Sequence, residues 1–150
     1  MEELRHILVV SRRTKQCREA VHMGVSLSKK FGADLTVLHV VDQNIEEGMG
    51  LTFVIEEELK HIMKKAEQEL DEIIRSEKIN GTPINEIVRT GNPNEEILKV
   101  VDDESIDLII MLSHPEGRIE RFLFGRDNDK IVRKMPCSIL LLKAEHLPIK

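Results

Sequence analysis

Residues 108–117 are LIIMLSHPEG, and the chain continues through Phe124-Gly125-Arg126-Asp127 to a second apolar run, PCSILLL, over residues 136–142. This order is typical of a buried strand, a loop, the start of a helix and a last buried strand. Open α/β folds build anion-binding loops in this way, between the carboxyl end of a strand and the amino end of the next helix. The stretch therefore predicts both the fold class and the place of a nucleotide-like site.

Length and charge restrict the class of protein. A chain of 150 residues fits one compact domain, which we expect to span residues 1–150. The net charge of -5 argues against nucleic-acid binding, because a phosphate backbone requires a basic face. The apolar run 7–10 is too short for a signal peptide or a membrane span. Cys17 and Cys137 lack a C-x-x-C spacing, which favours buried thiols in a reducing compartment, and we expect a cytoplasmic protein.

Five apolar runs bounded by turn residues predict five strands, over residues 7–10, 35–41, 84–88, 108–111 and 139–142. Four of the runs are nearly continuous in Val, Ile and Leu, as in parallel strands that helices cover on both faces. The run 84–88 alternates polar and apolar residues, which is typical of an edge strand. The last run, Ile139 to Leu142, would leave an apolar edge open to pairing with a second copy.

Helical patterns fill the four gaps between these runs. The first predicted helix has Thr14 as N-cap, ends at Gly32, and turns a face that includes Gly24 and Phe31 toward the sheet. The second turns Phe53, Leu59 and Leu70 inward among other apolar residues and ends at residues 80–81, and the third starts at Asn92-Pro93, a cap residue followed by a proline suited to the first turn. The fourth starts near residues 125–127 and ends at Met135-Pro136. Strict alternation predicts an α/β fold, a single open doubly wound parallel sheet of five strands with helices on both faces.

Five segments carry a resemblance to a known family: ILVV at residues 7–10, LHVVD at 38–42, Gly91-Asn92-Pro93, IMLSH at 110–114 and the ending MPCSILLL. Together they resemble the universal stress protein family over essentially the whole chain. The resemblance implies the strand order 3-2-1-4-5, with the reversal between the first and fourth strands. It also implies a homodimer formed through the last strand, Ile139 to Leu142. A role in the stress response through a protein partner of unknown identity is the function that it implies.

ATP-binding members of that family carry an Asp after the first strand and a loop of the form G-x2-G-x9-G-[S/T] after the fourth. In this chain Arg12 stands at the Asp position, Leu112 and Pro115 at the first two glycines, and Arg126 at the hydroxyl position. Four other matching positions are Val40 near the adenine, Ser113 and His114 within the loop, and Gly125 as the third glycine. Leu112 adds bulk and Pro115 removes an N–H donor, so the phosphate cradle loses shape and hydrogen bonds.

Two interpretations of the arginines remain open. In the first, Arg12 and Arg126 pair with Asp127, Asp129 or Glu116, and these internal ion pairs replace contacts with a ligand. In the second, the two arginines form a cationic clamp for an anion, with Arg13, Arg118 or Arg121 nearby. Asp127 and Asp129 would occupy the first turn of the last helix and compete there with phosphate.

The remaining titratable residues predict neither a metal site nor a catalytic one. His114 is a lone histidine after a strand, and His39, between Leu38 and Val40, is expected to be buried and hydrogen-bonded in the core. No histidine pair has zinc-ligand spacing, and neither a G-x-S-x-G elbow nor a Walker A loop is present. We interpret Cys137, at the start of a buried strand, as an inert thiol.

Three functions compete. The first is a regulatory or binding module without catalysis, in which the ATP site is lost or altered and no cofactor is held. The second is an ATP-binding or other adenine-nucleotide-binding switch, with at most slow ATP hydrolysis, in which the arginines replace the glycine-rich loop. The third is a sensor for another small anion. We favour the first on the exchanged loop residues.

Overall fold

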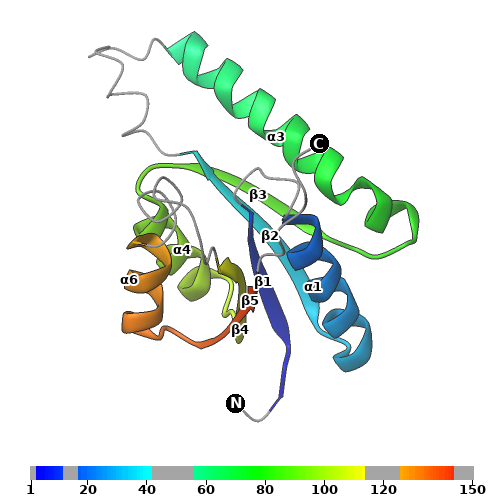
Figure 1. Ribbon diagram of the computed structural model, residues 1–150. Coiled ribbons are helices and arrows are strands. Elements are labelled where there is room, and N and C mark those ends of the chain that lie inside the picture. The colour runs from blue at the N-terminus through cyan, green and yellow to red at the C-terminus, as the bar shows by residue number, and fades with distance from the viewer. Residues whose placement is uncertain (1–2, 12–16, 42–55, 114–125, 144–150) are drawn as a thin grey trace.

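The computed structural model describes residues 3–11, 17–41, 56–113 and 126–143, and within them it confirms the predicted fold. Five parallel strands form one sheet in the order β3-β2-β1-β4-β5 (Figure 1). The strands are β1 (His6–Ser11), β2 (Asp34–Val41), β3 (Asn85–Thr90), β4 (Leu108–Ser113) and β5 (Ser138–Lys143). The order reverses between β1 and β4, as the family resemblance implies.

Four described helices cover the two faces of the sheet. They are α1 (Cys17–Phe31), α3 (Glu56–Ile79), α4 (Pro93–Asp103) and α6 (Arg126–Lys134). Helices α1 and α3 lie on one face, and α4 and α6 lie on the other (Figure 1). None of the described helices is long and apolar enough to cross a membrane.

The core consists of two apolar clusters that the sheet separates. Along β1, Ile7 and Val9 face the cluster under α1 and α3, whereas Leu8 and Val10 face the cluster under α4 and α6. Ile7, Leu8 and Val9 are fully buried, since each face of the strand is covered. This burial explains the continuous apolar run, because a strand covered on both faces has no position for a polar side chain.

The sequence predicted the elements better than their ends and faces. Each predicted strand is present, and β3 is an edge strand, as its alternating pattern indicated. The inward orientation predicted for Phe31 is wrong: this side chain is 60% exposed because α1 ends there, past the edge of the sheet. Thr14 and Phe53 lie outside the described residues.

Gly24 allows α1 to approach the sheet closely, as predicted. A Cβ atom at this position would lie 2.7 Å from Val9 Cγ2 and 3.0 Å from Leu35 Cδ1. The first contact is shorter than carbon atoms tolerate and is made with a β-branched side chain that has little rotamer freedom, and the second is tight enough that Leu35 would have to shift. The separation between α1 and the sheet therefore depends on a glycine here.

Replacing Gly24 by valine should lower the free energy of unfolding by about 1–3 kcal/mol, the usual cost of overpacking a well-filled core. Ser26→Val is the matched control, since Ser26 is exposed on the same helix and acquires the same β-branched residue. Urea denaturation of both variants measures the difference. Equal losses of stability would mean that helix propensity rather than close packing explains the glycine.

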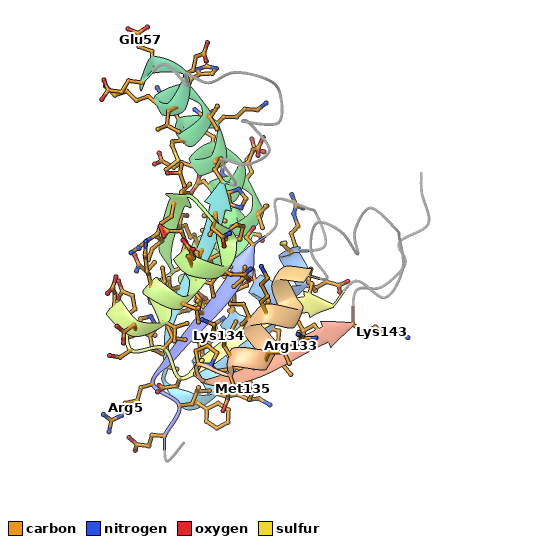
Figure 2. The ribbon with its side chains drawn as sticks, turned by 90° about the vertical axis from the view of Figure 1, so that its left-hand side faces the viewer. Arg5, Glu57, Arg133, Lys134, Met135 and Lys143 are labelled. Atoms are coloured by element: carbon orange, nitrogen blue, oxygen red, sulfur yellow. The ribbon has the colours of Figure 1, made fainter. Side chains whose placement is uncertain are left out.

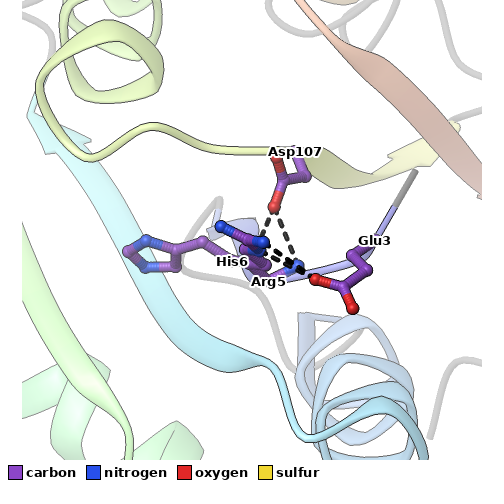
Figure 3. Close-up of polar contacts among 4 residues, drawn as sticks. All are labelled: Glu3, Arg5, His6 and Asp107. Carbon is purple, nitrogen blue, oxygen red and sulfur yellow. Dashed lines mark hydrogen bonds and ion pairs between the residues drawn. The ribbon is translucent and has the colours of Figure 1, made fainter. Parts of the chain in front are cut away.

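The amino end of β1 is fixed to β4 by one carboxylate. Asp107 Oδ2 accepts hydrogen bonds from the backbone N–H groups of Arg5 (2.8 Å) and His6 (2.9 Å), and the Asp107 N–H donates to His6 O (2.9 Å; Figure 3). The Arg5 guanidinium pairs with Glu3 at 2.9 Å, but both side chains are exposed, so this pair contributes little to stability. The three backbone bonds therefore hold this junction.

Candidate functional site

The predicted site lies at the carboxyl edge of the sheet, where the winding direction reverses. The adjacent parallel strands β1 and β4 end at Ser11 and Ser113, and their register pairs Ile7 with Leu108 and Val9 with Ile110. Because the strands are parallel, β2 ends at this edge too. Helices α1, α4 and α6 begin on the same side, so their N–H groups are presented there.

The structure places only part of the predicted set of site residues. Arg12, His114 and Gly125 lie outside the described residues. Ser113 is the last residue of β4, and Arg126 is the first residue of α6. Val40 is half-buried near the end of β2, and it packs against the cluster under α4 and α6. Ser113 thus ends the strand on one side of β1, and Val40 lies one residue before the end of the strand on the other side; their contact with a ligand stays a prediction.

Leu112 is a core residue of β4. It is 4% exposed, pairs in register with Leu142 of β5, and belongs to the cluster under α1 and α3. Strand β4 continues for one more residue, to Ser113. The chain therefore keeps strand geometry through the position at which the family's loop has its first glycine.

His39 is buried beside the end of β1, as predicted. It is 5% exposed, and its Nδ1 lies 3.1 Å from the carbonyl oxygen of Ser11. Since a carbonyl oxygen only accepts hydrogen bonds, Nδ1 carries the proton. His39 thus holds the last residue of β1. The sequence did not single out Ser11, because a polar residue after an apolar run does not show whether its carbonyl is held.

The start of α4 is built by three residues. Gly91 donates its N–H to Val41 O (3.0 Å) with φ of 136°, a conformation suited to glycine. Asn92 Oδ1 accepts from the N–H groups of Asn94 (3.0 Å) and Glu95 (3.3 Å), and Pro93 occupies the first turn. Asn92 is therefore the predicted N-cap, and its side chain occupies N–H groups that an anion would otherwise bind.

Replacing Asn92 by alanine should lower the free energy of unfolding by about 1 kcal/mol, because two N–H groups of α4 lose their acceptor. Asn92→Asp keeps an acceptor and should stay within about 0.5 kcal/mol of the parent. Thermal or urea denaturation distinguishes the two. A loss of equal size in both variants would contradict the capping role.

Two hollows reach toward this edge. One, of about 490 Å³, lies by the first turns of α1, part of α3 and the end of β5, and is lined by Arg18, Glu19, His22, Met23, Ile73, Ser76, Glu77, Leu142 and Lys143. Another, of about 340 Å³, lies between the start of α4 and α6, and its basic residues are Lys130, Arg133 and Lys134. Figure 2 labels Arg133 and Lys134 on α6. Both volumes lie in the range of small-molecule sites. The second has an excess of positive charge along α6 and suits an anion better than a cation.

Titratable groups of the described residues give no sign of metal or thiolate chemistry. Within residues 3–11, 17–41, 56–113 and 126–143, no three His, Cys, Asp or Glu side chains lie close enough to hold a metal ion. Burial, together with the nearby negative charge of Asp107, raises the pKa of Cys137 to about 11, against a weaker opposite effect from a backbone hydrogen bond with Ile109. The Cys137 thiol therefore stays protonated at neutral pH, in agreement with the predicted inert role.

Comparisons with known proteins agree with this geometry. A family model described as the Universal stress protein family matches residues 3–143. The universal stress protein MJ0577 of Methanocaldococcus jannaschii is 30% identical over 90 residues, which cover 60% of this chain and about half, 51%, of that relative. A universal stress protein of Thermus aquaticus is 27% identical over 140 residues, or 91% of this chain and 97% of the relative.

Solved structures share the fold over nearly the whole chain. The structure of MJ0577 superposes with a TM-score of 0.73 at 24% identity, covering 96% of this chain and 99% of that one. A universal stress protein of Archaeoglobus fulgidus in complex with dAMP superposes with a TM-score of 0.64 at 12% identity, covering 94% of this chain and 98% of that one. A third, in complex with cAMP, has a TM-score of 0.62 at 14% identity and covers 96% of this chain and all of the other. At these identities the likeness concerns the fold.

Proposed function

Because the chain belongs to the universal stress protein family, we propose that it is a cytoplasmic stress-response protein that acts by binding partners and does not hold ATP in the family's usual way. The observation that carries this proposal is the burial of Leu112. At the position of the loop's first glycine, the chain has a strand residue that is 4% exposed and packed in the core. A backbone held in a strand, with a leucine side chain in the core, cannot turn its N–H groups around a phosphate as a glycine loop does.

Three further exchanges support the loss of the usual ATP site. Pro115 has no N–H to donate at the second glycine position, and Arg12 replaces the Asp after β1. Arg126 stands at the hydroxyl position and opens α6, followed by Asp127. A carboxylate in a first helical turn is stabilised by the helix dipole and repels phosphate. The proposed role is non-catalytic, with slow ATP hydrolysis at most.

An absorbance spectrum tests the proposal directly. The chain contains no Trp and no Tyr, so bound adenine would dominate its spectrum near 260 nm. We expect the purified protein to release no stoichiometric nucleotide on denaturation, as judged by mass spectrometry. We also expect Mg²⁺-ATP to leave its melting temperature unchanged, since a ligand that binds only the folded state would raise it. A stoichiometric adenine nucleotide, or a saturable rise in melting temperature, would overturn the proposal.

A nucleotide-binding switch is the second candidate, favoured by the relatives solved with cAMP and dAMP. In this alternative Arg12 and Arg126 contact the phosphate. If a nucleotide raised the melting temperature, Arg12→Ala and Arg126→Ala should each reduce that rise, whereas Arg75→Ala, at an exposed position of α3, should not. Stabilisation by inorganic phosphate alone, without a preference for ATP, would instead support an anion sensor.

We also propose that the protein is a homodimer that pairs through β5. The strand lies at one edge of the sheet, next to β4 only. Leu140 and Leu142 pack with the cluster under α1 and α3, whereas Leu141, which faces the opposite way, is 45% exposed. An edge strand with an exposed leucine favours pairing with a second copy.

Replacing Leu141 by lysine should convert the dimer to monomers at micromolar concentration, because the interface would bury the lysine charges of the two copies or bring them close enough to repel each other. Ser138→Lys is the control, since Ser138 is exposed at the start of the same strand and should leave the dimer intact. Light scattering after size exclusion measures the mass, and circular dichroism checks that both variants are folded. A folded, dimeric Leu141→Lys variant would exclude this interface.

A further inference from the structure

A separate cleft lies at the amino edge of the sheet, opposite the candidate nucleotide site. It has a volume of about 770 Å³. Its walls come from the starts of β1 and β2, the turn between α3 and β3, and the C-cap of α4; they include His6, Asp34, Thr36, Lys78, Thr82, Asn85 and Glu104. Figure 1 shows α1 and α3 ending on this side of the sheet, next to the connections that lead into β2 and β3.

The cationic residue of the cleft is already neutralised. Lys78 Nζ lies 2.5 Å from Glu86 Oε1 and 3.3 Å from Asp71 Oδ1. The hydrogen bond with Glu86 has the largest effect on the pKa of Lys78 and raises it; burial opposes this effect, and the hydrogen bond with Asp71 adds to it. Lys78 therefore stays charged and held by its two carboxylates, so it does not offer a free positive charge to a ligand.

Both ring nitrogens of His6 also have partners within the protein. Its Nδ1 lies 2.8 Å from Glu104 O, and its Nε2 lies 2.7 Å from Thr36 Oγ1. The carbonyl of Glu104 only accepts hydrogen bonds, so Nδ1 carries a proton and donates it to this carbonyl. The ring nitrogens are therefore not available to a ligand in the cleft.

The acidic residues Asp34 and Glu104 line the cleft, and no salt bridge of the described residues includes either of them. The helix ends add to this negative charge, because a helix carries a partial negative charge at its carboxyl end. Helices α1 and α3 have lysines in their last turns, but α4 has no basic residue there and ends with Asp102 and Asp103. The cleft therefore suits a cation.

Thr82 supplies a second and independent sign of a ligand. It is 5% exposed, it lines the cleft, and its Oγ1 has no hydrogen-bond partner within the part of the chain that the structure describes. A buried hydroxyl without a partner is unfavourable, and an N–H donor that enters the cleft would satisfy it.

Apolar surface lies beside these polar groups. Phe31 is 60% exposed and Ile79 is 77% exposed, and each ends a helix next to a stretch of the lining, 33–36 or 81–85. Pro83 and Ile84 belong to the lining itself. Such surface is complementary to the methylene groups of an aliphatic chain rather than to a bare inorganic cation.

We propose that this amino-edge cleft is a binding site for an alkylammonium group, with Asp34 and Glu104 facing its charge, Thr82 accepting an N–H bond, and the apolar rim covering its aliphatic chain. The group belongs either to a free diamine or to a lysine side chain of a polypeptide. The proposal is independent of the proposed function, since the cleft and the carboxyl edge lie at opposite ends of the strands.

The test uses three probes of equal length and different charge: cadaverine, 1,5-pentanediol and glutarate. With ¹⁵N-labelled full-length protein, we expect cadaverine to shift amide signals of residues 33–36 and 81–85 in a saturable way, and the two other probes to leave them unchanged. A single exposed ion pair and a short chain should give a dissociation constant no weaker than roughly 10 mM, so the absence of any shift at 10 mM cadaverine would overturn the proposal. Shifts spread over the acidic surface, or an equal response to the diol, would overturn it too.

Variants locate the charge. The double variant Asp34→Asn, Glu104→Gln should weaken cadaverine binding about tenfold, at roughly three- to fivefold for each ion pair removed. Glu67→Gln, an exposed residue on the outer side of α3, is the control and should change nothing. Thr82→Val has a particular signature: it should raise the melting temperature, because an unpartnered buried hydroxyl is removed, while it weakens cadaverine binding. Unchanged cadaverine binding in the double variant would contradict the proposed site.

A fourth probe distinguishes the two sources of the ammonium group. Nα-acetyl-lysine amide carries one ammonium group on a peptide-like unit, and cadaverine carries two on a bare chain. Tighter binding of the lysine derivative would assign the cleft to a lysine of a partner polypeptide, and tighter binding of cadaverine would assign it to a free diamine. If neither bound, the proposal would be wrong.

Discussion

Burial of β1 on both faces is the constraint on which the rest of the structure depends. Ile7, Leu8 and Val9 have no exposed surface, since α1 and α3 cover one side and α4 and α6 the other. At about 25 cal/mol per Å² of apolar surface, such residues contribute roughly 1.5–3 kcal/mol each. Moreover, β1 is the one strand that connects both halves of the sheet, through β2 and β4. The candidate site lies at the edge of the sheet where β1 ends.

The two ends of the strands have different chemistry because parallel strands align their helices. At the carboxyl edge the helices begin, N–H groups are presented, and Asn92 occupies those of α4. At the amino edge the helices end, and α4 ends without a basic residue. A doubly wound sheet is therefore polar as a whole, with an anion-attracting edge and a cation-attracting edge. Each proposed site agrees with the polarity of its own edge.

The sequence predicted the fold well, because its evidence is local and repeated. Apolar runs, Gly24 and Asn92-Pro93 each reflect a requirement of packing or capping that the structure confirms. It failed at Phe31, because helical periodicity places a residue on a face but does not show where the sheet beneath ends. Two interactions were not predicted, because each joins segments far apart in the chain: the hydrogen bond between His39 and Ser11 O, and those that the Asp107 carboxylate accepts.

The candidate site itself was predicted as a location more than as a set of contacts. Val40, Ser113 and Arg126 lie at the expected edge, while the roles of Arg12, His114, Gly125 and Arg126 stay predictions. The amino-edge cleft left no signal in the sequence. Its walls come from four separate segments, and the neutralisation of Lys78 by Glu86 is a property of their assembly.

The junction between β1 and β4 has a consequence for how the chain folds. The strands β1, β2 and β3 pair with one another on one side of it, and β4 pairs with β5 on the other. Arg5 and Asp107, which meet at this junction, are 102 residues apart. Closing so long a loop costs more entropy than any contact between neighbouring elements, and contacts of large sequence separation slow folding. Asp107 thus lies where the two halves of the sheet must join, and its three hydrogen bonds with the backbone of Arg5 and His6, two of them accepted by the carboxylate, set the alignment of one half against the other.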